Sequence, residues 1–145
     1  MPERPACGLR SDAGDQDAVA LVLAMKTVAV VGCSPKPERP GHYVAAYLKE
    51  QGYRVVPVNP GHQELLGETC YPDLSSIPFP VDVVDVFRNP EVVEPVIDEA
   101  IKIKAKALWL QDGITHPEGE KRARAAGLLV VSNDCMLRQH NARRA

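Results

Sequence analysis

Short apolar runs alternate along this chain with longer stretches whose apolar positions recur at helical spacing. The runs are rich in β-branched residues and lead into loops that contain Gly, Pro or polar residues. Continuous runs of this kind are typical of strands that are buried on both faces of a parallel sheet. We expect five strands, at 27–31, 53–58, 81–86, 107–110 and 128–131.

Helical patterns fill most of the intervals between these runs. Helices are expected over 15–26, over 41–51, from Pro90 onward, from a Thr115-x-x-Glu118 capping box to Gly127, and in a short basic C-terminal segment. Asn89 suits an N-cap because its side chain can accept a hydrogen bond from a free helix amide, and Pro suits the position that follows. The segment 62–80 looks irregular, apart from a short helical turn at 74–77.

Strands that alternate with helices predict βαβ units and a parallel sheet. The fold class we expect is α/β, a Rossmann-like doubly wound parallel sheet of about five strands with helices on both faces. The preferred strand order is 3-2-1-4-5, and the flavodoxin-like order 2-1-3-4-5 is the alternative. We expect one domain over 15–145, preceded by a flexible N-terminal tail over 1–14 that is rich in Pro, Gly and charge.

Composition narrows the class of protein. The 145 residues suit one domain, and the formal net charge of −2 gives no sign of a nucleic-acid partner. No apolar run approaches the roughly 20 residues of a membrane helix, and the N-terminus lacks the apolar segment of a secretory signal. The four cysteines form no C-x-x-C pair, which argues against a zinc site or a redox dithiol and fits a cytoplasmic location.

The loop after the first strand is the most informative segment. Gly32 permits a tight turn and a close approach of a ligand to the backbone, and Ser34 offers a hydroxyl. Lys36 and Arg39 add positive charge just before a helix start, where free amides attract anions. The pattern indicates a phosphate or pyrophosphate cradle. An ordinary strand-to-helix turn with solvated cations remains the alternative.

The same loop speaks against the usual nucleotide cofactors. It reads Gly-Cys-Ser-Pro-Lys-Pro and therefore lacks the second and third glycines of G-x-G-x-x-G. Asn59 and Pro60 follow the second strand, where an acidic residue would bind the ribose of NAD. No P-loop motif is present. A nicotinamide-dependent reductase is therefore only a distant alternative.

Several motifs follow one another in a particular order and spacing: the loop 32–40, Pro57-Val58-Asn59-Pro60, Gly67-x-x-Cys70-Tyr71-Pro72, Val81 to Arg88, and Ala105 to Ile114. This combination resembles the small stand-alone proteins with a Rossmann-type CoA-binding domain. The resemblance covers about residues 15 to 140 and extends to the N-terminal domain of the succinyl-CoA synthetase α subunit. It implies coenzyme A as the ligand.

The resemblance also implies roles for particular residues. Gly32, Cys33, Ser34, Pro35, Lys36 and Arg39 would form the phosphate loop, and Asn59 and Pro60 would line the nucleotide side. Val86, Phe87 and Arg88 would form a wall, and Gln111, Gly113 and Ile114 would face the pantetheine arm. Two departures are Gly41, where relatives often carry Ser, and Asp112, an acid in a loop that is often apolar.

No complete catalytic centre is visible. The four histidines have no partners at the spacing of a catalytic triad, and we interpret them as surface residues. Cys33 and Cys135 both follow strands; a mixed disulfide with the CoA thiol is conceivable, but we favour two small buried side chains. We expect non-covalent CoA binding and no metal. The alternative is a CoA-binding subunit of an acyl-CoA synthetase-like enzyme that needs a partner chain.

Overall fold

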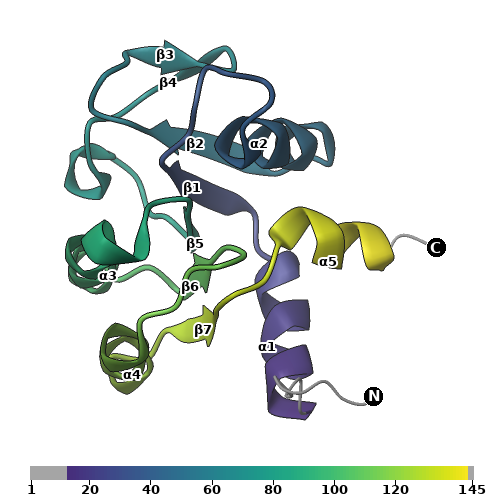
Figure 1. The fold of residues 1–145 in the computed structure, drawn as a ribbon, viewed down its shortest axis with the longest axis vertical. Helices are drawn as coiled ribbons and strands as arrows, with labels where there is room; N and C mark the ends of the chain where they lie inside the picture. The colour runs from purple at the N-terminus through teal and green to yellow at the C-terminus, as the bar shows by residue number, and fades with distance from the viewer. Residues whose placement is uncertain (1–12, 144–145) are drawn as a thin grey trace.

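The computed structural model describes residues 13–143, and the predicted tail therefore lies almost entirely outside the described residues. Five parallel strands form one sheet, with helices on both of its faces (Figure 1). The strands of this sheet are β1 (Thr27–Val31), β2 (Arg54–Val58), β5 (Val83–Val86), β6 (Ala107–Leu110) and β7 (Leu129–Val131). This arrangement confirms the predicted Rossmann-like α/β class.

The strand order is β2-β1-β5-β6-β7, which corresponds to 2-1-3-4-5 and is the alternative order. The preferred order 3-2-1-4-5 was wrong, because β5 pairs with β1 and β6 instead of lying outside β2. Among the described residues, the outer edge of β2 pairs only through an isolated parallel bridge between Val58 and Tyr71, and residues 68–69 also pack against this strand. Part of the irregular segment thus lies where the preferred order placed a third strand.

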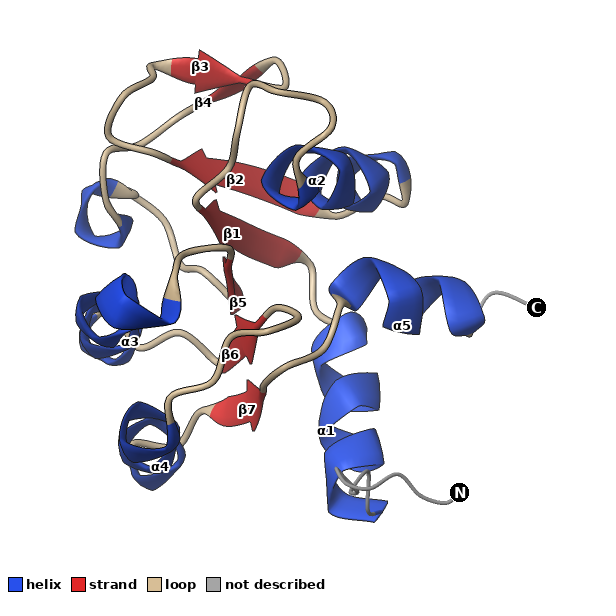
Figure 2. Ribbon diagram, in the orientation of Figure 1, coloured by secondary structure: helices blue, strands red, loops and turns tan. Residues whose placement is uncertain are grey.

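Two helices cover one face of the sheet and three cover the other (Figure 2). They are α1 (Ala13–Leu23), α2 (Pro40–Glu50), α3 (Val93–Lys102), α4 (Pro117–Ala125) and α5 (Met136–Ala142). Buried side chains of α3 and α4 pack with alternate strand residues on the first face, and those of α1, α2 and α5 pack on the second. Successive strand side chains point to opposite faces, so each strand contributes to both cores.

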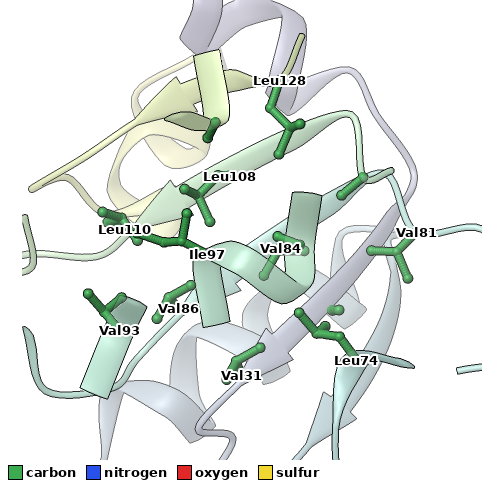
Figure 3. Close-up of a cluster of buried hydrophobic side chains, with 14 of the residues drawn as sticks. Val31, Leu74, Val81, Val84, Val86, Val93, Ile97, Leu108, Leu110 and Leu128 are labelled. Atoms are coloured by element: carbon green, nitrogen blue, oxygen red, sulfur yellow. The ribbon is translucent and has the colours of Figure 1, made fainter. Parts of the chain in front are cut away.

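The core under α3 is built from branched aliphatic side chains (Figure 3). Val84 and Val86 of β5 face Val93 and Ile97 of this layer, and all four are fully buried. The opposite core contains Trp109 on β6, whose indole nitrogen donates to the Asp134 carbonyl at 3.0 Å. A partner for the indole N–H allows this large side chain to be completely buried.

Local structure departs from expectation at two helix starts. A 3₁₀ turn, η2 (Pro90–Val92), precedes α3, and Asn89 makes no side-chain capping bond. The expected capping box at Thr115 is displaced by one residue: the His116 ring accepts from the Gly119 amide, and Glu120 accepts from the His116 amide. A histidine ring therefore performs the capping that the hydroxyl was expected to perform.

The segment 62–80 is more ordered than expected. It contains a two-stranded hairpin of β3 (Glu64–Leu65) and β4 (Glu68–Thr69), followed by the 3₁₀ turn η1 (Leu74–Ser76) where a helical turn was predicted. Leu66 and Gly67 both have positive φ, as a two-residue turn of this kind requires. Lys49 of α2 holds the hairpin, because its ammonium donates to the Leu66 carbonyl at 2.6 Å and pairs with Glu68.

The backbone at Gly41, in the first turn of α2, packs closely against the backbone of Gly32. A Cβ at this position would lie 2.5 Å from the Gly32 carbonyl oxygen. Replacing a helical glycine by alanine ordinarily stabilises a protein by up to about 1 kcal/mol. At Gly41 this gain is outweighed, because the backbone must shift to relieve the overlap.

We expect Gly41→Ala to lower the free energy of unfolding by about 1–3 kcal/mol, measured by urea denaturation. Gly61→Ala is the matched control, since a Cβ there would make only an ordinary contact with the Asn59 side chain at 3.5 Å. A Gly41→Ala variant that is as stable as the unaltered protein would contradict the proposed contact.

Candidate functional site

A cleft of about 390 Å³ lies at the carboxyl ends of the central strands. Its walls come from the loops that follow β1, β5 and β6 and from the first turn of α2. Ligands bind at this edge in open parallel α/β sheets, because the loops there converge above the strand ends. The residues that line the cleft are Gly32, Ser34, Arg39, Pro40, Gly41, Tyr43, Val44, Phe87, Arg88, Asn89, Pro90, Gln111, Asp112, Gly113, Ile114 and Cys135.

Backbone forms one end of the cleft. Gly32 has φ +89°, and a Cβ there would lie 3.0 Å from the Phe87 carbonyl oxygen. The amides of Ser34 and Gly41 donate no hydrogen bond to any other described residue. The Ser34 hydroxyl instead accepts from the Lys36 amide at 3.1 Å. The free amide of Gly41 lies in the first turn of the eleven-residue helix α2 and favours an anion, because the helix dipole is positive there.

Two cations line the cleft. Arg39 precedes α2 and Arg88 follows β5, and neither forms an ion pair with another described residue. The one acid in the lining, Asp112, is held by Arg138 through two hydrogen bonds of 2.9 Å. This bidentate pair reduces the repulsion that Asp112 would exert on an anionic ligand. The lining side chains whose charge is not neutralised by an ion pair are therefore positive, although the formal net charge of the protein is −2.

The remaining lining is largely apolar. Tyr43 on α2 is 47% exposed, which leaves its ring available to a ligand. Phe87 packs against the core beside α2 and also reaches the cleft, and Ile114 lies in the β6 loop. Aromatic and aliphatic groups beside cations suit a ligand with both a flat apolar part and an anionic part.

A buried carboxyl lies beneath the cleft. Asp85 on β5 is fully buried, and its Oδ1 accepts from the Gln111 amide nitrogen at 2.5 Å. Burial raises the pKa of Asp85 to about 8, and the hydrogen bond from Gln111 only partly opposes that shift. Burial favours the neutral form because charge is poorly solvated in the core. Gln111, which is 4% exposed, connects this carboxyl to the cleft.

Eight of the fourteen sequence-predicted site residues line the cleft. They are Gly32, Ser34, Arg39, Phe87, Arg88, Gln111, Gly113 and Ile114. The other six lie outside its lining: Cys33, Pro35, Lys36, Asn59, Pro60 and Val86. Cys33 and Val86 are fully buried in the two cores, whereas Pro35, Lys36 and Pro60 are exposed.

Asn59 acts on the cleft indirectly. Its side-chain nitrogen donates to the Cys33 carbonyl at 2.8 Å, and its oxygen accepts from the Gly61 amide at 2.9 Å. The side chain therefore ties the loop after β2 to the loop after β1. The resemblance implied that Asn59 lines the nucleotide side, whereas its side-chain hydrogen bonds in the structure are with backbone.

Sequence reasoning missed the α2 contribution to the cleft. Pro40, Gly41, Tyr43 and Val44 all line it, as do Asn89, Pro90 and Asp112. The helical periodicity of α2 predicted which side chains face the core, but it did not indicate that Tyr43 lines the cleft. Proximity to the first loop was the available signal, because the first turn of a helix that follows a phosphate-binding loop faces the ligand.

Burial disfavours the thiolate form of the described cysteines. Burial, with a smaller contribution from Cys70, raises the pKa of Cys33 to about 12. Burial also raises the pKa of Cys135, although this residue lines the cleft. A thiol of raised pKa is a poor nucleophile, which agrees with the interpretation of both residues as packing groups.

Three of the four histidines make close polar contacts through their ring nitrogens, which we did not expect of surface residues. His42 contacts the Ser34 carbonyl at 2.8 Å, His116 caps α4, and His140 lies 2.7 Å from the Tyr47 hydroxyl. His62 is exposed, as expected. Within residues 13–143, no group of three or more His, Cys, Asp or Glu side chains could hold a metal ion, and no helix is long and apolar enough to cross a membrane.

A family model described as a CoA binding domain matches residues 26–141. The chain belongs to the CoA binding domain family. The uncharacterized protein YneT of Bacillus subtilis is 34% identical over 115 residues, which cover 79% of this chain and 85% of YneT. Family membership confirms the resemblance inferred from the loop motifs.

Solved structures of family relatives agree with this fold. A hypothetical protein from Pyrococcus horikoshii superposes with a TM-score of 0.87 and 42% identity, and the match covers 98% of this chain and 97% of that one. The dinucleotide-forming acetyl-coenzyme A synthetase 1 of Korarchaeum cryptofilum matches with a TM-score of 0.66 and 32% identity. That match covers 73% of this chain but only 26% of the synthetase. The chain is thus similar both to stand-alone proteins and to one part of a larger enzyme.

The raised pKa of Asp85 predicts a pH-dependent stability. The neutral carboxyl stabilises the folded state fully below about pH 4, and that stabilisation is lost as the pH rises toward 8. Asp85→Asn cannot ionise, so the unaltered protein should lose stability relative to the variant by about 1.4 kcal/mol for each pH unit inside this window. Urea denaturation from pH 5 to 8 measures the difference.

Asp98→Asn removes an exposed carboxyl and controls for the loss of a negative charge. A stability difference between the unaltered protein and Asp85→Asn that stays constant from pH 5 to 8 would show that Asp85 is ionised throughout.

Proposed function

We propose that this protein binds coenzyme A non-covalently in the cleft above β1, β5 and β6 and has no complete catalytic site of its own. The observation that carries the proposal is the composition of the cleft in a chain of the CoA binding domain family. The lining combines the amides of Ser34 and Gly41 and two arginines that form no ion pair with a described residue with aromatic and aliphatic side chains. Coenzyme A has the matching parts: a pyrophosphate, a further phosphate on the ribose, an adenine ring and a long pantetheine arm.

The phosphates fit the start of α2. The amides of Ser34 and Gly41 and the guanidinium of Arg39 would hold the pyrophosphate, and Arg88 would contact the same group from the β5 side. Arginine suits this role because its planar donors match phosphate oxygens. Lys36 lies outside the cleft lining and would contribute through its charge at longer range.

The apolar parts of the ligand fit the remaining walls. Tyr43 and Phe87 offer rings on which adenine or the pantetheine arm can pack. Gly113 and Ile114 border the path toward β6. Asn59 and Pro60 support the nucleotide side by fixing the first loop. No step of bond formation is required of any residue, and the free cysteines suit a reducing compartment such as the cytoplasm.

A second candidate function has one specific observation in its favour. The chain resembles about a quarter of an acetyl-coenzyme A synthetase, so it could serve as the CoA-binding subunit of an enzyme whose catalytic residues lie on a partner chain. Co-purification with such a partner, and turnover of acyl-CoA by the pair but not by this chain alone, would favour that function.

We expect Arg39→Ala and Arg88→Ala each to weaken CoA binding by about 1.5–3 kcal/mol, because each removes charge-assisted hydrogen bonds to phosphate. Lys36→Ala should have a smaller effect. Titration calorimetry measures all three. Lys102→Ala is the matched control, since it removes an exposed cation from the last turn of α3, outside the cleft lining. Unchanged affinity in both arginine variants would refute the site.

The identity of the ligand can be tested without mutation. Native mass spectrometry of the freshly purified protein should reveal a mass that corresponds to CoA or an acyl-CoA. In a competition experiment, NADPH should fail to displace CoA, because the first loop lacks the glycines of dinucleotide-binding proteins. Displacement of CoA by equimolar NADPH would favour the reductase alternative instead.

A further inference from the structure

Asp85 is a fully buried polar residue in the middle strand of the sheet. It lies on β5, which has β1 on one side and β6 on the other, and its register partners there are Val30 and Trp109. All three side chains are fully buried. Among the buried side-chain oxygen and nitrogen atoms of residues 13–143, only the Oδ2 of Asp85 has no hydrogen-bond partner.

Stability does not explain this carboxyl. Burying a polar group without satisfying all of its hydrogen bonds is unfavourable, and valine would fill a similar volume at this position. No charged side chain of a described residue compensates for the burial; the hydrogen bond from Gln111 is the partner that the carboxyl has. We therefore look for the role of the Asp85 carboxyl in its hydrogen bond with Gln111.

Gln111 connects the carboxyl to the cleft. Its amide nitrogen donates to Asp85, which orients the side-chain amide and leaves the carbonyl oxygen Oε1 without a donor among the described residues. This oxygen is not among the buried unpartnered atoms. Because Gln111 lines the cleft, Oε1 is the polar atom of this side chain that a ligand can reach.

The position of Gln111 suits the far end of the ligand. It follows β6, which lies two strands from β1 and hence about 10 Å from the phosphate end of the cleft. A pantetheine arm that leaves a pyrophosphate at α2 would cross the end of β5 and arrive at β6. The arm contains two amide groups, each with one N–H donor.

We propose that Asp85 is a positioning residue: it holds the Gln111 amide so that Oε1 accepts a hydrogen bond from an amide N–H of the pantetheine arm. This inference rests on the proposed function, because it assigns a contact to a bound CoA. A hydrogen bond from the arm to Gln111 Oε1 makes the cleft prefer ligands with an amide-bearing arm over nucleotides that carry only the phosphates and the adenine.

Two ligands separate the arm from the nucleotide. CoA carries the pantetheine arm, and adenosine 3′,5′-bisphosphate lacks it. Asp85→Val removes the acceptor for Gln111, so it should weaken CoA binding about five- to ten-fold, as the loss of one hydrogen bond does. Binding of the bisphosphate should change less than about two-fold. Titration calorimetry at pH 7 measures both, with near-ultraviolet circular dichroism to verify that the variant is folded.

Two further variants test the route through Gln111. Asp85→Asn keeps an acceptor for the Gln111 amide and should retain the CoA affinity of the unaltered protein. Gln111→Leu should weaken CoA binding as much as Asp85→Val does, and the double variant should be no weaker than either single one, because both remove the same hydrogen bond.

The outcomes are distinguishable. If the unaltered protein binds no CoA, the proposed function fails and the inference fails with it. If CoA binds but Asp85→Val weakens CoA and the bisphosphate equally, or leaves both unchanged, the positioning role is overturned and CoA binding stands. If Asp85→Val does not fold, additive effects of Asp85→Asn and Gln111→Leu on CoA affinity would overturn the role, and an unaffected Asp85→Asn beside a CoA-specific loss in Gln111→Leu would support it.

Discussion

The cleft depends on three backbone segments that approach more closely than side chains would allow. The first loop touches the start of α2 at Gly41, and the end of β5 touches the same loop at Gly32. A single Cβ at either glycine would meet a carbonyl oxygen at 2.5 or 3.0 Å. Because α2 cannot retreat without losing its packing on the sheet, these contacts fix where the free amide of Gly41 lies. The position of the proposed anion-binding end follows from that constraint.

Polar groups around the cleft are arranged so that positive charge dominates. Asp112 would oppose an anion, yet Arg138 from α5 neutralises it through a bidentate pair and also contacts Asp134. Asp85 is a carboxyl as well, and burial favours its neutral form. Arg39 and Arg88 are left free to attract a ligand. The acidic net charge of the chain therefore says little about the field inside its cleft.

Several elements of the fold could be predicted because their signals are local. The β-branched run at Thr27–Val31 and the α2 stripe with Val44 and Leu48 follow from periodicity alone. Strand order could not be predicted in this way, since every pair of parallel strands makes the same backbone hydrogen bonds. Both orders bury the apolar runs. The choice depends on how the segment 62–80 crosses the sheet; in the structure this segment contributes β4 and an isolated bridge at Tyr71 beside β2, and no full strand pairs there among the described residues.

The sequence by itself determined the class of the fold, because local periodicity reveals strands and helices. It also singled out the loop after β1 as the candidate site, from its glycine, prolines and cations, and its resemblance to a known family implied coenzyme A as the ligand to test. Tertiary structure decided which loops meet: it brought Tyr43 and Cys135 into the cleft lining, left Cys33 and Val86 in the core, and placed Gln111 over Asp85. Contacts between segments far apart in the chain depend on strand order and helix packing, which no local pattern encodes.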